Sequence, residues 1–259
     1  MLVANGASAA LTYNPGDMIL GFRKAGGTSN LEVDLGSVQN ILNIAGTGQV
    51  LTFNQFTASD ITAGVGTAGS GSLNSAIWSV SAATSLGTQV SGVPAKTIWA
   101  TSARGINSAD INTQTTPWVR QSATLQGNTT SPILTVGSGF AAASGNAGST
   151  TAAVIADGSN SYHENITDNG NFNAFQGNIE NTLSSTFVTG GSNARSDLYQ
   201  MNPNAGGGNG TFLGYFQLTP GGSLSFVAVP EPGMFGVGVA GGLMLLALAR
   251  AHRKSEANS

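Results

Sequence analysis

The stretch Met18-Ile-Leu-Gly-Phe-Arg-Lys-Ala-Gly-Gly-Thr-Ser-Asn-Leu-Glu-Val-Asp-Leu35 carries the clearest structural pattern in the chain. Apolar side chains occupy every second position on both sides of a Gly-rich segment at residues 25–29, which is the period of a half-buried β-strand. Glu32 and Asp34 fall between the apolar residues of the second half, so they are expected on the solvent face. The sequence therefore predicts a β-hairpin here.

Other short apolar runs bounded by turn residues repeat this pattern along the chain. Near its end, Thr219-Pro-Gly-Gly222 separates two such runs, and Pro followed by Gly is a strong turn signal. The runs that we predict as strands are residues 50–56, 77–82, 97–101, 133–136, 152–156, 212–218 and 223–229.

Helical periodicity is rarer. Four phenylalanine, isoleucine and leucine side chains between residues 172 and 183 fall on one helical face, which predicts a helix there. Residues 38–44 predict a second, shorter helix. Three segments rich in glycine and small polar residues are expected to be linkers: residues 63–75, 137–150 and 202–210.

Many short strands, Gly-rich turns and one or two short helices are typical of a mainly β protein. We expect an antiparallel β-sandwich-like domain at residues 11–228. A solenoid is the alternative, because the chain has 37 glycines and many small polar residues. The chain shows no repeat of fixed period, which favours the sandwich.

Charge is scarce throughout the chain. Charged residues make up 8% of its 259 residues, against about a quarter in an ordinary globular domain. With only nine Lys and Arg residues, the chain lacks the clustered cations of a nucleic-acid binder, so no nucleic-acid partner is expected. The absence of cysteine excludes disulfides, thiolate metal sites and cysteine nucleophiles. This composition is typical of exported β proteins.

Both ends of the chain suggest export. Ala7-Ser-Ala9 has the small-residue form of a signal-peptidase site, so residues 1–10 are interpreted as the remnant of an export signal. Near the other end, the seventeen residues 233–249 carry no charge and would span about 25 Å as a helix. This pattern predicts a single C-terminal transmembrane helix, with the basic residues that follow it on the cytoplasmic side.

The segment 229–259 resembles the PEP-CTERM sorting signal of Gram-negative bacteria. It has the same three parts in order: the tripeptide Pro230-Glu231-Pro232, a short apolar span and a basic end. The resemblance implies that an exosortase, a membrane protease of the transpeptidase type, recognises the tripeptide and cuts near it. It assigns recognition to Pro230, Glu231 and Pro232, and stop-transfer to the three basic residues Arg250, Arg253 and Lys254.

The body of the chain also resembles a group of PEP-CTERM passengers. The matching runs are residues 13–23 near the start and residues 197–201 and 213–216 ahead of the sorting signal. This resemblance implies a secreted passenger and carries no established biochemical activity with it.

Motifs that would indicate catalysis are weak. Gly64-Val-Gly-Thr-Ala-Gly69 matches a dinucleotide fingerprint as text, but no acidic residue follows at the distance that would hold a ribose, so a loop is favoured. His163 could join Asp157 or Asp168 in a triad, yet the chain contains no G-x-S-x-G nucleophile elbow. We therefore expect no catalytic residues and no cofactor.

Two binding hypotheses remain open. Asn169-x-Asn171-x-Asn173 with Glu180 imitates the spacing of a calcium loop but lacks its first carboxylate and its glycine, so a helix cap at Asp168 or Asn169 is favoured over a metal site. The tryptophans could form a sugar-stacking platform, although single tryptophans within strands are usually core residues. These three residues are Trp78, Trp99 and Trp118.

The sequence thus predicts an exported, non-enzymatic cell-surface or extracellular-matrix protein. Its expected partners are an exosortase, the inner membrane as a transient anchor, and exopolysaccharide. One alternative is a secreted carbohydrate-binding module or carbohydrate-active enzyme that carries the same sorting signal. Another is a stable single-pass membrane protein that is never processed.

Overall fold

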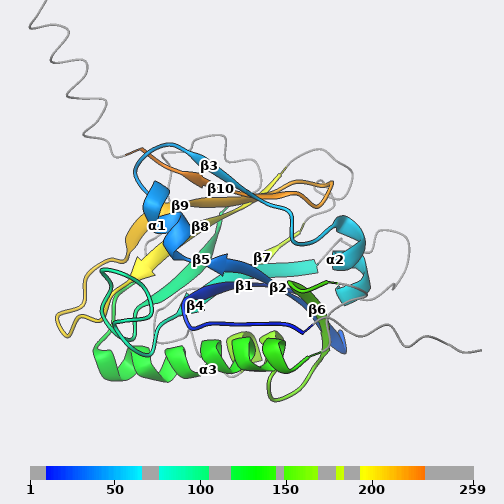
Figure 1. Ribbon diagram of the computed structural model, residues 1–259, viewed down its shortest axis with the longest axis horizontal. Coiled ribbons are helices and arrows are strands. Elements are labelled where there is room, and N and C mark those ends of the chain that lie inside the picture. Colours follow the sequence, from blue (N-terminus) through cyan, green and yellow to red (C-terminus); the bar gives the residue numbers. More distant parts are fainter. Residues whose placement is uncertain are drawn as a thin grey trace, which may run out of the picture.

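One antiparallel sheet, with ten strands among the described residues, organises the domain (Figure 1). The structure is a computed structural model that describes residues 10–65, 76–104, 118–143, 149–168, 179–183 and 193–230. The strand order is β3-β10-β9-β8-β5-β4-β1-β2-β6, and β7 pairs with β4 beside this path. The strands are β1 (Asp17–Lys24), β2 (Ser29–Ser37), β3 (Val50–Phe53), β4 (Ala76–Ala83), β5 (Ile98–Arg104), β6 (Ala152–Ala156), β7 (Asn181–Thr182), β8 (Ala194–Met201), β9 (Thr211–Leu218) and β10 (Leu224–Ala228).

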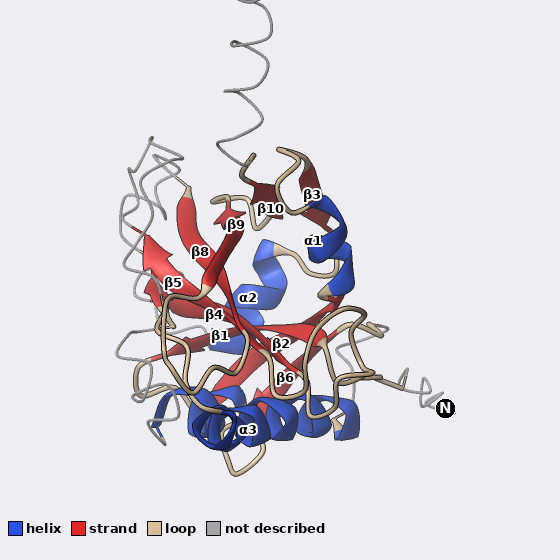
Figure 2. Ribbon diagram, turned by 90° about the vertical axis from the view of Figure 1, so that its left-hand side faces the viewer, coloured by secondary structure: helices blue, strands red, loops and turns tan. Residues whose placement is uncertain are grey.

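Helices cover both faces of the sheet. The long helix α3 (Ala123–Ala142) lies across one face, whereas α1 (Gln39–Ile44) and α2 (Ala58–Val65) lie on the opposite side (Figure 2). A short π-helical segment, η1 (His163–Asp168), lies next to α3. The expectation of a mainly β, antiparallel domain with few helices is confirmed.

The predicted hairpin forms the middle of the sheet. β1 pairs with β2 on one side and with β4 on the other, and Gly26 adopts a positive φ of 71° in the turn. Its strands are buried on both faces, because Phe22 and Leu31 face one core while Ile19 faces the other. Glu32 is fully buried, so its expected solvent exposure is wrong. The side chains that alternate along these strands therefore point to two buried faces of the sheet, rather than to one buried and one exposed face.

The prediction of a sandwich is wrong in detail, since all ten strands belong to one hydrogen-bonded sheet. That sheet curls until distant strands share a core. The ring of Phe56, just beyond β3, lies 5.7 Å from that of Phe22 in β1. The curl therefore brings distant strands, together with α1 and α2, around one core, while α3 and η1 cover the other face.

Most strand predictions are confirmed, with boundaries shifted by at most three residues. Six strands of the structure coincide with or overlap the predicted runs: β3, β4, β5, β6, β9 and β10. The turn at Thr219–Gly222 joins β9 to β10 as expected, with Gly222 at a φ of 83°. The helix predicted at residues 38–44 is α1. The structure also contains β8, η1 and residues 58–62 of α2, where the sequence pattern predicted no element.

The strand predicted at residues 133–136 is wrong, because these residues lie within α3. The helix is rich in Gly, Ser and Thr and contains Pro132, which makes it a poor helix by propensity. Ile133, Val136 and Phe140 recur with helical spacing and are buried against the sheet. Burial of this face outweighs the weak local preference, and Ser122 caps the first turn.

The helix predicted at residues 172–183 is wrong at its C-terminal end. Asn181 and Thr182 form β7, which pairs with Ile77 and Trp78 of β4. The two apolar residues at this end, Ile179 and Leu183, belong to opposite cores, so they do not share a face. Residues 169–178, which include the three asparagines of the calcium-loop-like spacing, lie outside the described residues; Glu180, its last member, is described and binds Arg23.

The predicted linkers have mixed outcomes. Residues 202–210 are irregular as expected, whereas residues 63–65 end α2 and residues 137–142 belong to α3. Among the described residues, no helix is long and apolar enough to cross a membrane. The predicted transmembrane span at 233–249 and the export remnant up to residue 9 lie outside the described residues.

Candidate functional site

The residues assigned to sorting begin where the described body ends. Pro230 is the last described residue, two positions after β10, and it forms an isolated bridge with Gly46. The N–H of Ala228 donates to the carbonyl of Gln49 at 2.9 Å, and a Cβ built on Gly48 would lie 2.9 Å from Pro230 Cγ. The turn at residues 46–49 thus holds the chain up to the first residue of the tripeptide.

The other sorting residues lie outside the described part of the chain. These are Glu231 and Pro232 of the tripeptide and the basic residues Arg250, Arg253 and Lys254. β10 itself is an internal strand, between β9 on one side and β3 on the other. Because an internal strand bonds on both edges, the body holds the chain firmly immediately before the tripeptide.

A buried polar network lies beneath η1 on the face that α3 covers. The guanidinium of Arg23 binds the carboxylate of Glu180 through two hydrogen bonds, of 2.7 and 2.6 Å. The hydroxyl of Tyr162 donates to the same carboxylate at 3.0 Å and hydrogen bonds to the Ser79 hydroxyl. At the other end, the N–H of Tyr162 donates to Glu32 Oε1 at 2.7 Å. We call these five residues the Tyr162 network.

Strand register explains how the Tyr162 network assembles. Gly21 of β1 pairs with Glu32 on β2 and with Ser79 on β4, so the three residues form one row across the sheet. The ring of Tyr162 lies directly on Gly21, where any side chain would overlap it. Gly21 therefore leaves the space in which Tyr162 reaches Ser79 on one side and Glu32 on the other.

Burial shifts the protonation of two members of the network. The side chain of Glu32 is inaccessible to solvent, and burial raises its pKa to about 8 despite the hydrogen bond from the Tyr162 N–H. Burial, together with the nearby Glu180 carboxylate, raises the pKa of Tyr162 well above its usual value. Within the described residues, Glu32 Oε2 has no hydrogen-bond partner. A protonated Glu32 at neutral pH follows from this environment.

The Tyr162 network has acids but lacks the access that catalysis needs. Glycoside hydrolysis requires two carboxyl groups facing a cleft that holds the substrate. Glu32 is fully buried and Glu180 is 7% exposed. The network therefore ties three strands to η1 rather than presenting an acid and a base to a ligand.

A second buried pair lies on strands β5 and β8. The guanidinium of Arg104 lies 2.6 Å from the carboxylate of Asp197, and both side chains are almost wholly buried. Arg104 and Arg195 both lie over the ring of Tyr215, at 5.1 and 5.3 Å from its centre. The carboxylate of Asp197 and the face of the Tyr215 ring together compensate the charges of the two guanidinium groups.

The residues considered for a triad form a simple surface pair. His163 Nδ1 lies 2.7 Å from Asp157 Oδ2, and the Ser161 hydroxyl donates to the same carboxylate. Although partial burial acts in the opposite sense, the hydrogen bonds from His163 and Ser161 lower the pKa of Asp157. Asp168 ends η1. Among the described residues, no group of three or more His, Asp or Glu side chains could hold a metal ion.

The tryptophan platform is wrong. Trp78 and Trp99 are fully buried and Trp118 is 2% exposed, so all three are core residues. The apparent dinucleotide fingerprint begins inside α2, where Gly64 packs against Leu31; residues 66–75 lie outside the described residues. A fingerprint glycine should instead lie in the turn before a helix, so Gly64 serves close packing.

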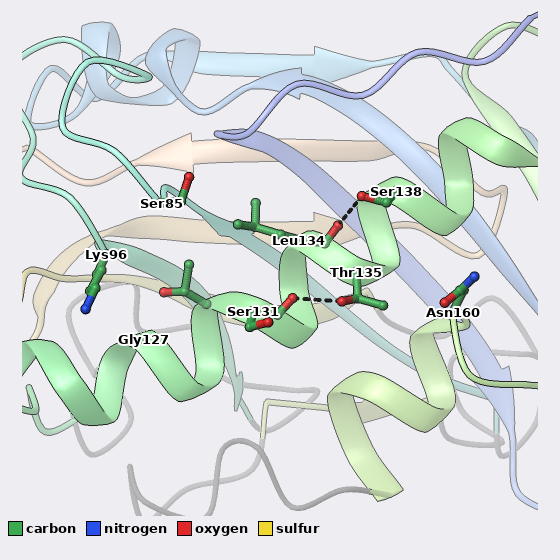
Figure 3. A pocket seen from close by; sticks show the side chains of 9 residues that line it. Ser85, Lys96, Gly127, Ser131, Leu134, Thr135, Ser138 and Asn160 are labelled. Atoms are coloured by element: carbon green, nitrogen blue, oxygen red, sulfur yellow. Dashed lines mark hydrogen bonds between the residues drawn. The ribbon is translucent and has the colours of Figure 1, made fainter.

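The pocket that the sequence did not predict runs along the exposed side of α3 (Figure 3). It has a volume of about 390 Å³ and extends from Lys96 at one end to Asn160 at the other. We call it the α3 groove; its lining residues are Ser85, Lys96, Gly127, Thr130, Ser131, Leu134, Thr135, Ser138 and Asn160. The helix was predicted as a strand and a linker, so its polar face could not be recognised beforehand.

Comparisons with known proteins add no assignment. No family model matches the chain, and neither the curated proteins nor the solved structures contain a match.

Proposed function

We propose that this chain is an exported, non-enzymatic cell-surface or extracellular-matrix protein whose C-terminal signal is recognised and cut by an exosortase. The observation that carries the proposal is the position of Pro230. The body holds the chain through β10 and through the turn at residues 46–49. The tripeptide starts at Pro230, which forms a bridge with Gly46 of that turn.

This arrangement suits a passenger that is released from its membrane anchor. All strands of the described sheet precede Pro230, so a cut near the tripeptide leaves that sheet complete. The hydrogen bonds that β10 makes to β9 and β3 also keep the body folded up to the cleavage segment. The chain therefore enters the tripeptide from a fixed point on the body, at Pro230.

The absence of an enzymatic role is part of the same proposal. The acids of the Tyr162 network are buried, and Asp157 and His163 pair with each other on the surface. The low charge of the chain also suits a protein outside the cell, since ten of its twelve acidic residues and six of its nine basic ones precede Glu231.

The test is the intact mass of the native protein, measured in cells that contain an exosortase and in cells that lack one. We expect the first form to end near the tripeptide and the second to keep residues 250–259. Glu231→Ala should block processing in the first host. Glu256→Ala, which removes an acid from the far tail, is the matched control and should be processed normally.

Two outcomes would overturn the proposal. A mature form that still carries residues 250–259 in the exosortase host would indicate a stable single-pass membrane protein. Recovery of the chain in the cytoplasmic fraction, with an unprocessed N-terminus, would contradict export itself.

A further inference from the structure

We propose that the α3 groove binds a short, carboxylate-bearing oligosaccharide. The proposal goes beyond sorting, because it assigns a ligand to the body and can be tested on the purified protein.

The size of the α3 groove fits a small ligand. Its volume of about 390 Å³ falls in the range of roughly 300–1,000 Å³ that is usual for small-molecule sites. From Gly127 to Ser138 it follows about 16 Å of helix, at about 1.5 Å of rise per residue. A linear molecule of a few rings therefore matches its shape better than a compact ion does.

Three hydroxyl groups of the groove are arranged to accept hydrogen bonds. Thr130 donates its hydroxyl proton to the Gln126 carbonyl, and Thr135 donates to that of Ser131. Ser138 donates to the Leu134 carbonyl at 2.9 Å (Figure 3). Each of these three hydroxyls thus donates its proton to the helix backbone and keeps oxygen lone pairs for a ligand.

Such a surface selects a ligand rich in donors. A sugar offers several O–H groups along its length, and each can donate to one of these oxygens. A fully deprotonated anion such as sulfate has no proton to donate, so the same hydroxyl oxygens would offer it little. Asn160 adds an amide, with both a donor and an acceptor, at the far end of the groove.

Lys96 gives the groove its preference for negative charge. It is the one cation among the lining residues, and no carboxylate lines the groove. Gly127 leaves room for its side chain, since a Cβ there would lie 3.3 Å from the Lys96 ammonium. Within the described residues the ammonium makes no ion pair. One carboxylate on the ligand would complement it.

Peptides fit this surface poorly. Two common kinds of peptide site are a free sheet edge and a groove with several apolar anchor pockets, and acidic peptide motifs are usually bound by a cluster of arginines. The α3 groove lies on a helix, and Leu134 is the one large apolar side chain in its lining. The observed chemistry therefore favours an acidic glycan.

The experiment is a titration of the full-length chain, purified in a detergent that contains no sugar, followed by calorimetry and by NMR. The probes are trigalacturonate, the neutral trisaccharide maltotriose and the peptide triglutamate. We expect trigalacturonate to bind with a Kd below 1 mM, at least ten-fold more tightly than either of the other two.

Two pairs of variants locate the site. Lys96→Met should weaken trigalacturonate binding at least ten-fold, whereas Lys24→Met, which removes a cation outside the groove, should not. Ser131→Trp should block the groove, whereas Asn128→Trp, at an exposed position of α3 outside the lining, should leave binding unchanged. Circular dichroism of each variant checks that it is folded.

Three results would overturn the proposal: no binding of trigalacturonate up to 10 mM, equal affinity for triglutamate, or affinity that Lys96→Met leaves unchanged. None of these bears on processing at the tripeptide, so failure here is distinguishable from failure of the sorting proposal.

Discussion

The aromatic ring of Tyr162 rests directly on the backbone of Gly21. A Cβ at Gly21 would overlap the ring, although the two residues are 141 positions apart in the chain. This contact places the Tyr162 hydroxyl between Ser79 and Glu180, and its N–H against Glu32. A glycine in the middle of a buried strand is therefore what allows the network to form.

Replacement of Gly21 by alanine should displace the Tyr162 ring and break the network. Since overpacking a core costs about 1–3 kcal/mol and the lost buried hydrogen bonds add to it, we expect Gly21→Ala to destabilise the protein by about 3 kcal/mol. Chemical denaturation measures the change. Gly158→Ala is the control, because Gly158 has an ordinary φ and open space around it. Equal, small effects at both positions would contradict the contact.

Glu32 should make stability fall as the pH rises. Its pKa is about 8 in the fold, above the usual 4.5, so the folded state keeps a proton that the unfolded chain loses. The stability that this proton brings is complete below about pH 4.5 and is lost as the pH rises through 8. Glu32→Gln cannot ionise and still accepts the hydrogen bond from Tyr162.

We therefore expect Glu32→Gln to gain stability relative to the wild type, by a few kcal/mol, between pH 5 and pH 9. Denaturation curves at each pH measure the gain. Glu164→Gln makes the same change at a partly exposed position of η1 and is the matched control. Parallel pH profiles for Glu32→Gln and the wild type would refute the prediction.

Replacement of only one partner of the Arg23–Glu180 ion pair should lower the stability of the protein substantially. Removal of one partner of a buried pair typically costs about 3–5 kcal/mol, because the other charge is left without compensation. We expect a value near the lower end for Arg23→Met, since the Arg23 side chain is 13% exposed. The double variant Arg23→Met with Glu180→Leu should cost less than Arg23→Met alone. Strict additivity of the two changes would show that the pair is uncoupled.

The contact of Gly48 with Pro230 should control how tightly the body holds the start of the tripeptide. Gly48→Ala places a methyl group against the Pro230 ring at a position whose φ is 78°. We expect faster hydrogen exchange at the Ala228 N–H, which donates to Gln49. Gly92→Ala is the matched control, since Gly92 has a φ of 76° and nothing within 4 Å. If the Ala228 N–H exchanges at the same rate in both variants, backbone strain alone explains the effect and the contact with Pro230 does not.

The sequence predicted strands well where alternation is strict. The β1–β2 hairpin and the β9–β10 hairpin each have a turn that glycine or proline defines, so local chemistry alone specifies them. It failed at α3, whose residues have poor helix propensity, and at residues 179–183, where helical spacing was coincidental. In both segments, the sheet face that each side chain meets decides the structure.

The candidate sites divide in the same way. The tripeptide and its flanking span are read from contiguous residues, so sequence reasoning could name Pro230, Glu231 and Pro232. The α3 groove combines residues from the β4–β5 loop, from α3 and from the turn before η1. No local signal connects these segments, because they meet only after the sheet has formed.

The sequence by itself determined the antiparallel β character of the body and its low charge, because alternation and composition are local properties. The proposed sorting signal likewise rests on a contiguous motif. The tertiary structure alone decided that the strands form one curled sheet, that Glu32 is buried and that Lys96 lies at the end of a hydroxyl-lined groove. These features depend on contacts between residues far apart in the chain, which only packing against a common core brings together.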